Sequence, residues 1–578
     1  MKESVLFRAR GSRSEPWILA GMAVAVGAVS SIVAVLLRGG VHELFEALAR
    51  YRDAWWAPLL PAAGALLGVW IVRLVFREPA GHGVSAVLEA VSRRGGAMRP
   101  RSIFSRLLGS MVNVASGGSA GLEGPTVFSS AAVGSVLAGL ARVGERQRIL
   151  LLACGVAGGI GAIFNAPLTG MIFALEVVLA EWTLGAVLPI AISATVATEI
   201  GRQVFGRSGA FALEGGVAWH SADLAACAVL GAGAGLLSVA MVGLIVGIEL
   251  AGRRLRATRL FGWPGALAML GGLAVGVIGI AQPHAIGEGY AAVNLALSGG
   301  LSDGLLALAV LGAAKTLATS LTLGSGAPGG IFAPSLVLGA TLGTLFGAAL
   351  HALMPAAGFA PPSFFALAAM AGFVSGTMHA PFTGILLALE TTEGWHGTLP
   401  LILVAVLSTL VSRTLLRHSF YTWELEERGT LLRPGTDRRI LADLKASELL
   451  DEGVIRIAAG RTLEDLARLL PSTARSHFGV VDAQGRLLGM VDVASLRGVI
   501  FDETLRRITP VDTVMDTAVP RIGADESAMK AMERFEASGA WVLPVVDAQG
   551  RLIGTISKGT LFDRYRSELI LQTAEKSA

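Results

Sequence analysis

The sequence predicts an all-α membrane domain that crosses the bilayer several times, followed by a smaller α/β domain. Of the 578 residues, 53% are hydrophobic and only 16% are charged, whereas an ordinary soluble protein carries about 25% charged residues. No Asp, Glu, Lys or Arg lies between Lys315 and Glu390, and this run is far longer than the roughly 20 apolar residues that cross a bilayer. After residue 425 charged residues become frequent, which marks a second, water-soluble domain.

The membrane domain begins with a helix that we expect to be retained. Lys2, Arg8, Arg10 and Arg13 precede a long apolar run, and no typical cleavage site follows it. Because basic residues favour the cytoplasmic side, we expect a multi-pass protein of the cell membrane with a cytoplasmic N-terminus. The predicted segments are an N-terminal segment at 1–15, the membrane domain at 16–425, a linker at 426–440, a first soluble repeat at 441–505, and a second repeat with the C-terminal tail at 506–578.

Two motifs occur twice within the membrane domain. "FNAPLTGMIFALE" (164–176) and "MHAPFTGILLALE" (378–390) share Ala-Pro-x-Thr-Gly and Ala-Leu-Glu, and "GGSAGLEGP" (117–125) corresponds to "GSGAPGGIFAP" (324–334). Two pairs in the same order indicate two homologous halves, which bring their Gly- and Pro-interrupted helices together near the middle of the bilayer. From these residues alone the halves could be parallel or inverted.

The interrupted segments predict an anion site. Helices that begin near Gly83, Pro125 and Pro334 would direct free N–H groups and the positive ends of their dipoles towards one point. The alternative is that these glycines serve helix packing. Glu123 is the one acid within these motifs, and a carboxylate inside a membrane is costly enough to suggest a function. Its alternative role is to offset the helix dipole. We predict that the ionised carboxylate occupies the anion site and that protonation releases it.

Residues 15–425 resemble the CLC family of chloride channels and chloride/proton antiporters. The motifs that carry the resemblance are GLEGP at 121–125, GIFAP at 330–334, GHGVS at 81–85, and the tyrosine of "HSFYTW". The resemblance implies two inverted-topology halves in each subunit of a homodimer, a pore in each subunit, and chloride or another small anion as the transported ion. It implies that Glu123 is the gating residue and that the anion is bound by His82, Gly83, Gly124, Ile331, Phe332 and Tyr421.

The chain departs from the family pattern around the expected anion site. His82 stands where the family has a serine, Ser85 replaces a proline, and Leu122 replaces a basic residue. An imidazole donates one hydrogen bond when neutral and becomes cationic near its reference pKa of about 6.5. The alternative is that His82 bonds a nearby carbonyl and faces away from the ion. The selectivity for chloride therefore rests on the resemblance alone.

A second departure affects proton coupling. Antiporters of this family usually carry an inner glutamate directly after Ala-Leu-Glu, where this chain has Val177. Glu176 is adjacent, but one residue turns a helix by about 100°, so we expect Glu176 and its repeat partner to make polar contacts at helix ends. We therefore favour passive conduction through a channel gated by Glu123, with chloride/proton antiport as the alternative.

The C-terminal domain contains its own repeat. "GVVDAQGRLLGMVDVASL" (479–496) and "PVVDAQGRLIGTISKGTL" (544–561) each predict a strand, a turn, a strand and the start of a helix. With the helical stretch before each copy, residues of about 440–570 resemble a tandem CBS domain pair. Proteins of the CLC family often carry such a pair at the C-terminus, and the resemblance implies that it lies in the cytoplasm. Neither copy has the terminal Asp of a nucleotide site, so we expect a dimerising or gating module rather than an adenine nucleotide site. The candidate ligand positions are Asp492, Ser495, Ser557 and Thr560.

Other classes of function are disfavoured by the composition. Cys154 and Cys227 lie in apolar runs and are expected to be packing residues without a disulfide. The net charge of +4 is spread thinly and does not suggest nucleic acid. We expect no enzyme activity, catalytic residue, metal or cofactor, and the bilayer, the anion and a second copy as partners. A CBS-regulated cation or metal transporter would need several intramembrane carboxylates, and a sensor that conducts nothing leaves Glu123 unexplained.

Overall fold

The structure, a computed structural model, divides into two units, Met1–Leu431 and Leu432–Ala578, and each is described by itself. Of the predicted N-terminal segment 1–15 only Glu15 is described, and of the predicted linker 426–440 only Glu426 and Glu427. The described residues are 15–575, apart from 53, 80, 207–210, 212, 214–218, 257–261, 302–303, 428–440, 443, 452 and 474.

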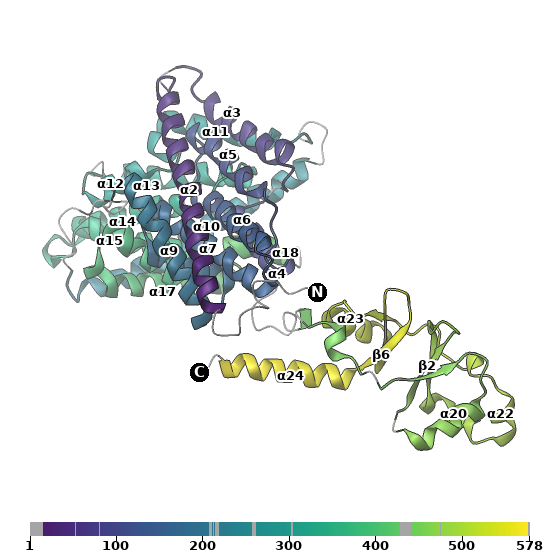
Figure 1. The fold of residues 1–578 in the computed structure, drawn as a ribbon. Helices are drawn as coiled ribbons and strands as arrows, with labels where there is room; N and C mark the ends of the chain where they lie inside the picture. Colours follow the sequence, from purple (N-terminus) through teal and green to yellow (C-terminus); the bar gives the residue numbers. More distant parts are fainter. Residues whose placement is uncertain are drawn as a thin grey trace. The chain divides into compact units, whose positions relative to one another are not determined.

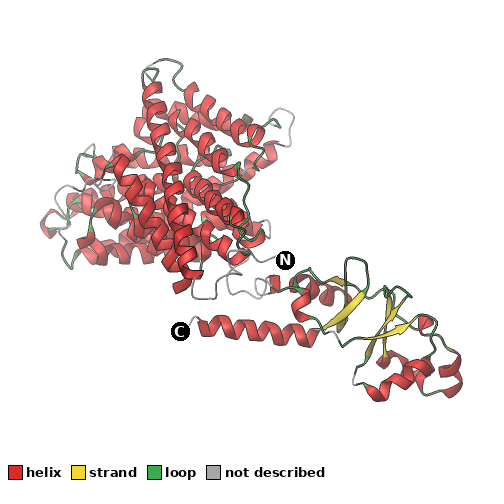
Figure 2. Cartoon of the chain, in the orientation of Figure 1, coloured by secondary structure: helices red, strands yellow, loops and turns green. Residues whose placement is uncertain are grey.

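The first unit is built from helices, as Figures 1 and 2 show. The helices of its first half are α2 (Glu15–Ala49), α3 (Leu59–Trp70), α4 (Gly83–Arg93), α5 (Ser102–Ala115), α6 (Glu123–Leu140), α7 (Glu145–Phe164), α8 (Pro167–Phe173) with its π-helical extension η2 (Ala174–Leu179), and α9 (Leu184–Phe205). Those of its second half are α10 (Asp223–Arg256), α11 (Ala266–Ala281), α12 (Tyr290–Leu297), α13 (Leu305–Gly324), α14 (Phe332–Leu353), α15 (Pro362–Met378), α16 (Pro381–Thr392), α17 (Thr398–Leu415) and α18 (Phe420–Glu427).

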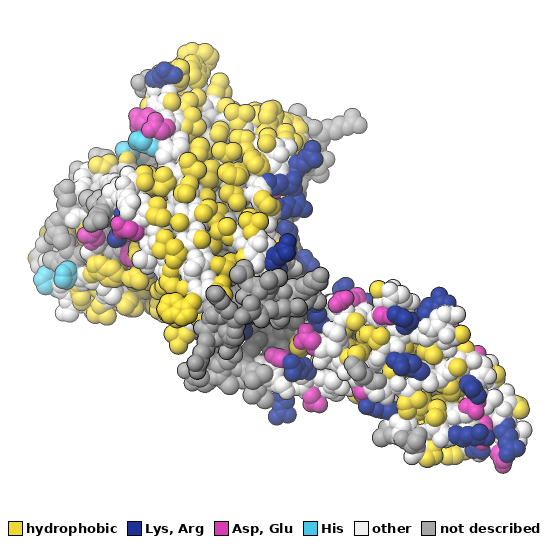
Figure 3. Space-filling view, in the orientation of Figure 1, with side chains coloured by type: hydrophobic (Ala, Val, Ile, Leu, Met, Phe, Trp, Pro, Cys, Tyr) yellow, Lys and Arg dark blue, Asp and Glu magenta, His cyan; other side chains and the backbone are white. Residues whose placement is uncertain are grey.

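The packing of the two halves repeats helix by helix. α6 packs on α7 and α7 on α9, while α14 packs on α15 and α15 on α17. α2 covers α7 and α9, and α10 covers α15 and α17 in the same way. Among the described residues, seven helices are long and apolar enough to cross a membrane, and hydrophobic side chains cover much of the visible face of this unit (Figure 3). The predicted membrane domain of two related halves is therefore confirmed.

The repeated Ala-Pro-x-Thr-Gly motif forms the same turn in both halves. The residue that follows α7 is Asn165, with φ 59°, and the residue that follows α15 is His379, with φ 57°. Both have the left-handed conformation that commonly ends helices. The next alanine has φ −131° and ψ 81° in the first half, and φ −128° and ψ 78° in the second. Pro167 and Pro381 then begin α8 and α16, because proline suits the first helical position. The motif therefore specifies a sharp break between two buried helices.

The second unit contains two sheets of three strands, each ordered by sequence (Figure 2). In each sheet the first strand is parallel to the second, and the second is antiparallel to the third. The pairing places Ile455 opposite Phe478 in the first sheet and Ile522 opposite Val545 in the second. The strands are β1 (Ile455–Ala458), β2 (His477–Val481), β3 (Leu487–Asp492), β4 (Ile522–Gly523), β5 (Val542–Val546) and β6 (Leu552–Ser557).

Identical hairpin turns connect the last two strands of each sheet. The Asp482 carboxylate accepts hydrogen bonds from the amides of Gln484 and Arg486 at 2.9 and 2.8 Å, and Asp547 makes the same two bonds in the second copy. The two hairpins also bind each other, because the Leu487 amide donates to Gly550 O at 3.1 Å and the Leu552 amide donates to Gly485 O at 3.1 Å. The two repeats are thus joined through their turns.

Helices cover both sheets of the second unit. They are α20 (Leu463–Leu469), α21 (Arg497–Ile500), α22 (Glu503–Ile508), α23 (Ala528–Ser538) and α24 (Lys558–Glu575). The order of strands and helices agrees with the predicted βαββα pattern in both copies, so the predicted mixed α/β domain is confirmed. The predicted limit between the repeats, after residue 505, falls within α22, and α18 continues two residues beyond the predicted end of the membrane domain at residue 425.

Candidate anion site

Glu123 lies at the contact between the first helical turns of α6 and α14. Its side chain is only 1% exposed. The carboxylate oxygen Oε1 accepts hydrogen bonds from the backbone amide of Phe332 and, at 3.3 Å, from that of Ala333. The other oxygen, Oε2, has no hydrogen-bond partner among the described residues. The carboxylate therefore occupies a place where amide groups at a helix N-terminus attract an anion.

Two glycines make room for this carboxylate. Gly121 and Gly330 pair across the two halves, each amide donating to the other's carbonyl at 2.8 Å. A Cβ atom added at Gly121 would overlap Oε2 of Glu123, and one at Gly330 would lie 2.5 Å from Oε1. A residue with a side chain at either position would therefore displace the carboxylate or the backbone around it.

The N-terminus of α4 meets α6 on the neighbouring side. A Cβ atom added at Gly83 would overlap the carbonyl oxygen of Gly124, so the two helices approach as closely as their backbones allow. The buried Arg106 side chain holds the preceding loop by donating to the carbonyls of Gly81 and, at 3.4 Å, Pro79. The first turns of α4, α6 and α14 are thus brought together, as the sequence predicted for the three interrupted helices.

Tyr421 contributes a buried phenol to this region from α18. The residue is 2% exposed, and its hydroxyl has no hydrogen-bond partner among the described residues. Its backbone carbonyl accepts a hydrogen bond from Ser85 Oγ at 2.8 Å. Ser85 therefore connects α4 to α18. Buried hydroxyl groups are usually bonded, and an unpaired donor of this kind is available to an anion.

The other predicted anion-binding residues take different positions. Ile331 and Phe332 are buried at the start of α14, and the Phe332 ring packs on Phe164 and Phe173 with centroid distances of 5.9 and 5.4 Å. The His82 ring instead has its Nε2 atom 3.7 Å from Oε2 of Glu249. The predicted role of His82 in anion binding stays a prediction.

Glu176 and Glu390 join the two halves at some distance in sequence from these motifs. Glu176 accepts hydrogen bonds from the amide and hydroxyl of Thr383 at 2.8 and 2.7 Å. Glu390 accepts the equivalent bonds from Thr169 at 2.6 and 2.7 Å. Each glutamate therefore caps the helix that begins at the proline of the repeated motif in the other half. Val177, beside Glu176, packs against the hydrophobic core.

Several charged groups of the membrane unit, Arg106 among them, were missed by sequence reasoning. Lys315 is completely buried and donates to the carbonyl of Gly287 at 2.9 Å. Glu249 and Arg253 form an ion pair of 2.9 Å on α10. The spacing of four residues was a signal for this pair, but the partners of Glu249 outside α10 are distant in sequence and give no local pattern. Among the described residues, no group of acids, histidines and cysteines is placed to hold a metal ion.

The candidate ligand positions of the C-terminal unit are occupied by local hydrogen bonds. The Asp492 carboxylate accepts from the Ala494 amide at 3.0 Å, and Ser495 Oγ donates to the Asp492 carbonyl at 2.6 Å. Ser557 Oγ lies 2.9 Å from Thr560 Oγ1 and accepts from the Thr560 amide at 3.0 Å. These contacts are those of side chains that cap the start of a helix.

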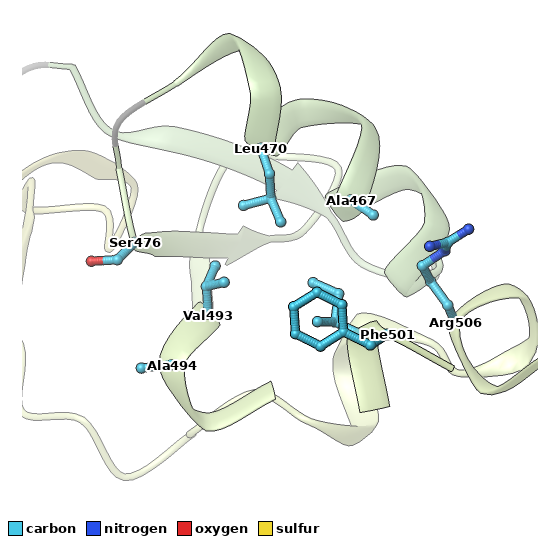
Figure 4. Close-up of a pocket in the computed structure, with 8 residues that line it drawn as sticks. Ala467, Leu470, Ser476, Val493, Ala494, Phe501 and Arg506 are labelled. Carbon is cyan, nitrogen blue, oxygen red and sulfur yellow. The ribbon is translucent and has the colours of Figure 1, made fainter. Parts of the chain in front are cut away.

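A pocket of about 380 Å³ lies beside β3 in the first repeat. Figure 4 shows its mainly apolar side chains, with Ser476 and Arg506 near its edges. None of the four candidate positions is among its lining residues, which are Ala467, Leu470, Ser476, Val493, Ala494, Ile500, Phe501 and Arg506.

Comparison with known families gives matches in both units. A family model described as voltage gated chloride channel matches residues 63–413, and a CBS domain model matches residues 511–567. The first repeat has the same strand order as the second, which supports a pair of such domains.

Similar proteins include both channels and exchangers by name. The chain is 36% identical over 358 residues to the putative chloride channel protein ClcB-like of Ralstonia nicotianae, covering 61% of this chain and 81% of that protein. It is 30% identical over 410 residues to the H(+)/Cl(-) exchange transporter ClcA of Klebsiella pneumoniae, covering 68% of this chain and 85% of that protein.

Solved structures share the fold at lower sequence identity. A slow cyanobacterial Cl−/H+ antiporter has a TM-score of 0.63 and 22% identity, covering 71% of this chain and 97% of that chain. A eukaryotic CLC transporter has a TM-score of 0.62 and 19% identity, covering 95% of this chain and 99% of that chain. At these identities the likeness concerns the fold.

Proposed function

We propose that this chain, which belongs to the voltage-gated chloride channel (CLC) family, exchanges chloride for protons across a membrane. The observation that carries the proposal is the position of the Glu123 carboxylate, whose oxygen accepts the amides of Phe332 and Ala333. An ionised carboxylate and a chloride ion compete for these amides, because both are anions. A protonated Glu123 has no charge and releases them to chloride. One group thus links the binding of a proton to the binding of an anion.

Exchange replaces the channel as the favoured function. The sequence-based preference for a channel depended on Val177, whereas several curated relatives with about 30% identity are named H(+)/Cl(-) exchange transporters. Passive conduction remains the second candidate, because Val177 offers no proton site and a relative with 36% identity is named a putative chloride channel protein. We further propose a homodimer whose C-terminal unit lies on the cytoplasmic side.

The two candidates differ in whether chloride can drive protons uphill. The purified chain is reconstituted in liposomes with a chloride gradient, equal pH on both sides, and a potential clamped by a potassium ionophore. Exchange predicts that chloride flow drives protons across the membrane and builds up a pH difference. Glu123→Gln should abolish this proton movement while chloride still moves. Chloride flux in the wild type without proton movement would contradict exchange and favour the channel.

A further inference from the structure

We propose that His82 and Glu249 form a second proton-binding site, separate from Glu123. This inference rests on the proposed exchange and addresses the route that Val177 leaves without an acid. An exchanger must take up protons on both sides of its anion site, and a charge that is isolated inside a membrane is strongly disfavoured. A paired imidazole and carboxylate can carry a proton there, since one partner offsets the charge of the other.

His82 lies directly beside the predicted anion-binding groups. It precedes α4, whose Gly83 meets Gly124 at the start of α6. Its ring packs on Phe420 with a centroid distance of 4.5 Å, and the next residue, Tyr421, has the unpaired buried hydroxyl. The Tyr421 ring also packs on Phe173 with a centroid distance of 6.4 Å, and Phe173 packs on Phe332, whose amide binds Glu123. His82 is therefore next to both α4 and α18 where they approach the anion site.

A chain of ionisable side chains leads from His82 towards the surface of the unit. The Nε2 atom of His82 is 3.7 Å from Glu249 Oε2, the other oxygen of Glu249 is 2.9 Å from Arg253, and Arg253 is 2.7 Å from Glu427. The exposed fraction of these side chains rises along the chain, from 12% and 15% to 34% and 36%. Glu123 itself is only 1% exposed. Because Arg253 stays protonated, we infer that protons reach the pair through the exposed 12% and 15% of the His82 and Glu249 side chains themselves.

The chemistry of the pair suits reversible proton binding. A neutral imidazole that directs its Nε2–H at Glu249 keeps the Nδ1 lone pair for an incoming proton. The imidazolium that forms is stabilised by the Glu249 carboxylate, and loss of the proton restores the neutral ring. Glu249 remains paired with Arg253 in both states, so the carboxylate does not have to leave its place.

Several other charged groups face this region and set its electrostatic surroundings. Arg106 binds the loop before His82 through the Gly81 carbonyl. A Cβ atom added at Gly81 would lie 3.0 Å from Glu424, so this acid faces the same loop. The π-helical segment η2 also packs on α4, and its Glu176 accepts a hydrogen bond from the Thr383 amide. With Glu123 on α6 and Arg253 and Glu427 near the surface, these are the charges that a proton on His82 would experience.

The test measures proton and chloride fluxes together in liposomes that contain the full chain. We expect His82→Gln and Glu249→Gln to lower the number of protons moved per chloride by about tenfold or more, as expected when a positioned proton carrier is lost. Chloride flux should persist in Glu249→Gln, because the amides of Phe332 and Ala333 are unchanged. Glu89→Gln is the control, since Glu89 lies on α4, the helix that His82 precedes, but pairs with Arg94 at 2.7 Å. The flux ratio of this variant should equal that of the wild type.

The outcomes separate this inference from the proposed function. A wild type that moves no protons uphill would contradict exchange itself. A coupled wild type whose proton-to-chloride ratio is unchanged in both variants would overturn the second site and leave exchange intact. Loss of all chloride flux in Glu249→Gln, while the protein remains folded, would also overturn it, because Glu249 is proposed to carry protons without holding the anion. A lowered ratio in only the two variants supports the proposal.

Discussion

At the scale of the residue, Gly121 controls whether the Glu123 carboxylate can enter the anion site. The three atoms nearest to a Cβ added at Gly121 all belong to the Glu123 side chain. Because a side chain moves more easily than a helix, we predict that Gly121→Ala expels the carboxylate and leaves the backbone in place. The variant should conduct chloride with little pH dependence and with proton coupling reduced about tenfold or more, as for loss of a positioned proton carrier. Liposome flux measured between pH 4.5 and 7.5 checks this.

A matched control separates this effect from a general effect of a larger residue. Gly139 lies near the end of α6, the helix that begins at Glu123, and a Cβ added there meets nothing within 4 Å. Gly139→Ala should therefore keep the pH dependence and coupling of the wild type. The effect of Gly121→Ala should also vanish in a Glu123→Ala background, where no carboxylate remains to be displaced. A full effect of Gly121→Ala in that background would show that the clash is with another group.

Glu526 illustrates a residue outside the membrane whose ionisation stabilises the fold. The Arg534 side chain donates to its two oxygens at 2.6 and 3.0 Å, and the Gly523 amide donates at 2.9 Å. These bonds, led by that from Arg534, lower the pKa of Glu526 from about 4.5 to about 2. Because the folded state binds the proton more weakly than the unfolded state, this contribution is present above pH 4.5 and is lost as the pH falls towards 2.

We predict that Glu526→Gln lowers the stability of the C-terminal unit at pH 7 and weakens its decline between pH 4.5 and 2. Differential scanning calorimetry of the full chain in detergent measures the transition of this unit at each pH. Glu536→Gln is the control, because Glu536 lies exposed on α23, the helix that carries Arg534. Equal acid sensitivity of the wild type and Glu526→Gln would mean that other carboxylates dominate the pH dependence.

At the scale of the element, the repeated motif holds the two halves together as well as breaking helices. Each Ala-Leu-Glu ending supplies the carboxylate that caps the start of the motif in the other half. Hydrogen bonds to a charged group contribute about 1.5–3 kcal/mol, so we predict that Glu390→Ala and Glu176→Ala each destabilise the membrane unit by about that amount. Their effects should be similar because the two contacts are equivalent. Thermal unfolding in detergent, followed by circular dichroism, measures both.

The two caps should also respond in the same way to a smaller change. Glu390→Gln keeps one acceptor oxygen and should cost less than Glu390→Ala. Glu393→Gln is a control, because Glu393 is exposed after the same helix and should leave the unfolding temperature unchanged. A large loss for Glu390→Ala with none for Glu176→Ala would show that only one of the two caps contributes to stability.

The sequence predicted these elements better than it predicted their partners. Helix breaks at Pro167 and Pro381 follow from the local conformations that proline and its neighbours allow, and Asp-Gly turns are likewise local. Contacts such as that between Glu176 and Thr383 join residues 207 positions apart, and no local pattern reports them. The contact of Glu123 with α14 is also distant in sequence, but the Gly- and Pro-interrupted motifs of the two halves indicated it. No motif indicated the pairing of His82 with Glu249.

At the scale of the whole molecule, the two units follow from the change of composition near residue 425, since apolar surface that faces lipid and charged surface that faces water need different sequences. The internal repeats of each unit are visible in the sequence because each copy repeats the residues that make its turns. The limits between segments stay predictions, and α18 and α22 continue across two of them. A helix end depends on what packs around it, and the sequence shows this only where a capping residue is present.

The division into two units predicts that transport belongs to the first unit alone. The groups that hold the Glu123 carboxylate, the Tyr421 hydroxyl and the chain from His82 to Glu427 all lie before residue 428. The second unit has its own hydrophobic clusters around Phe535 and Phe478. We therefore predict that the chain truncated after residue 440 still moves chloride and keeps the wild-type ratio of protons to chloride. Gel filtration confirms that the truncated protein is folded, and paired flux measurements give the ratio. If the folded truncated protein moved chloride with an altered ratio, the CBS pair would have to act on the proton route itself; an unchanged ratio with a changed rate would restrict its role to gating or dimer formation.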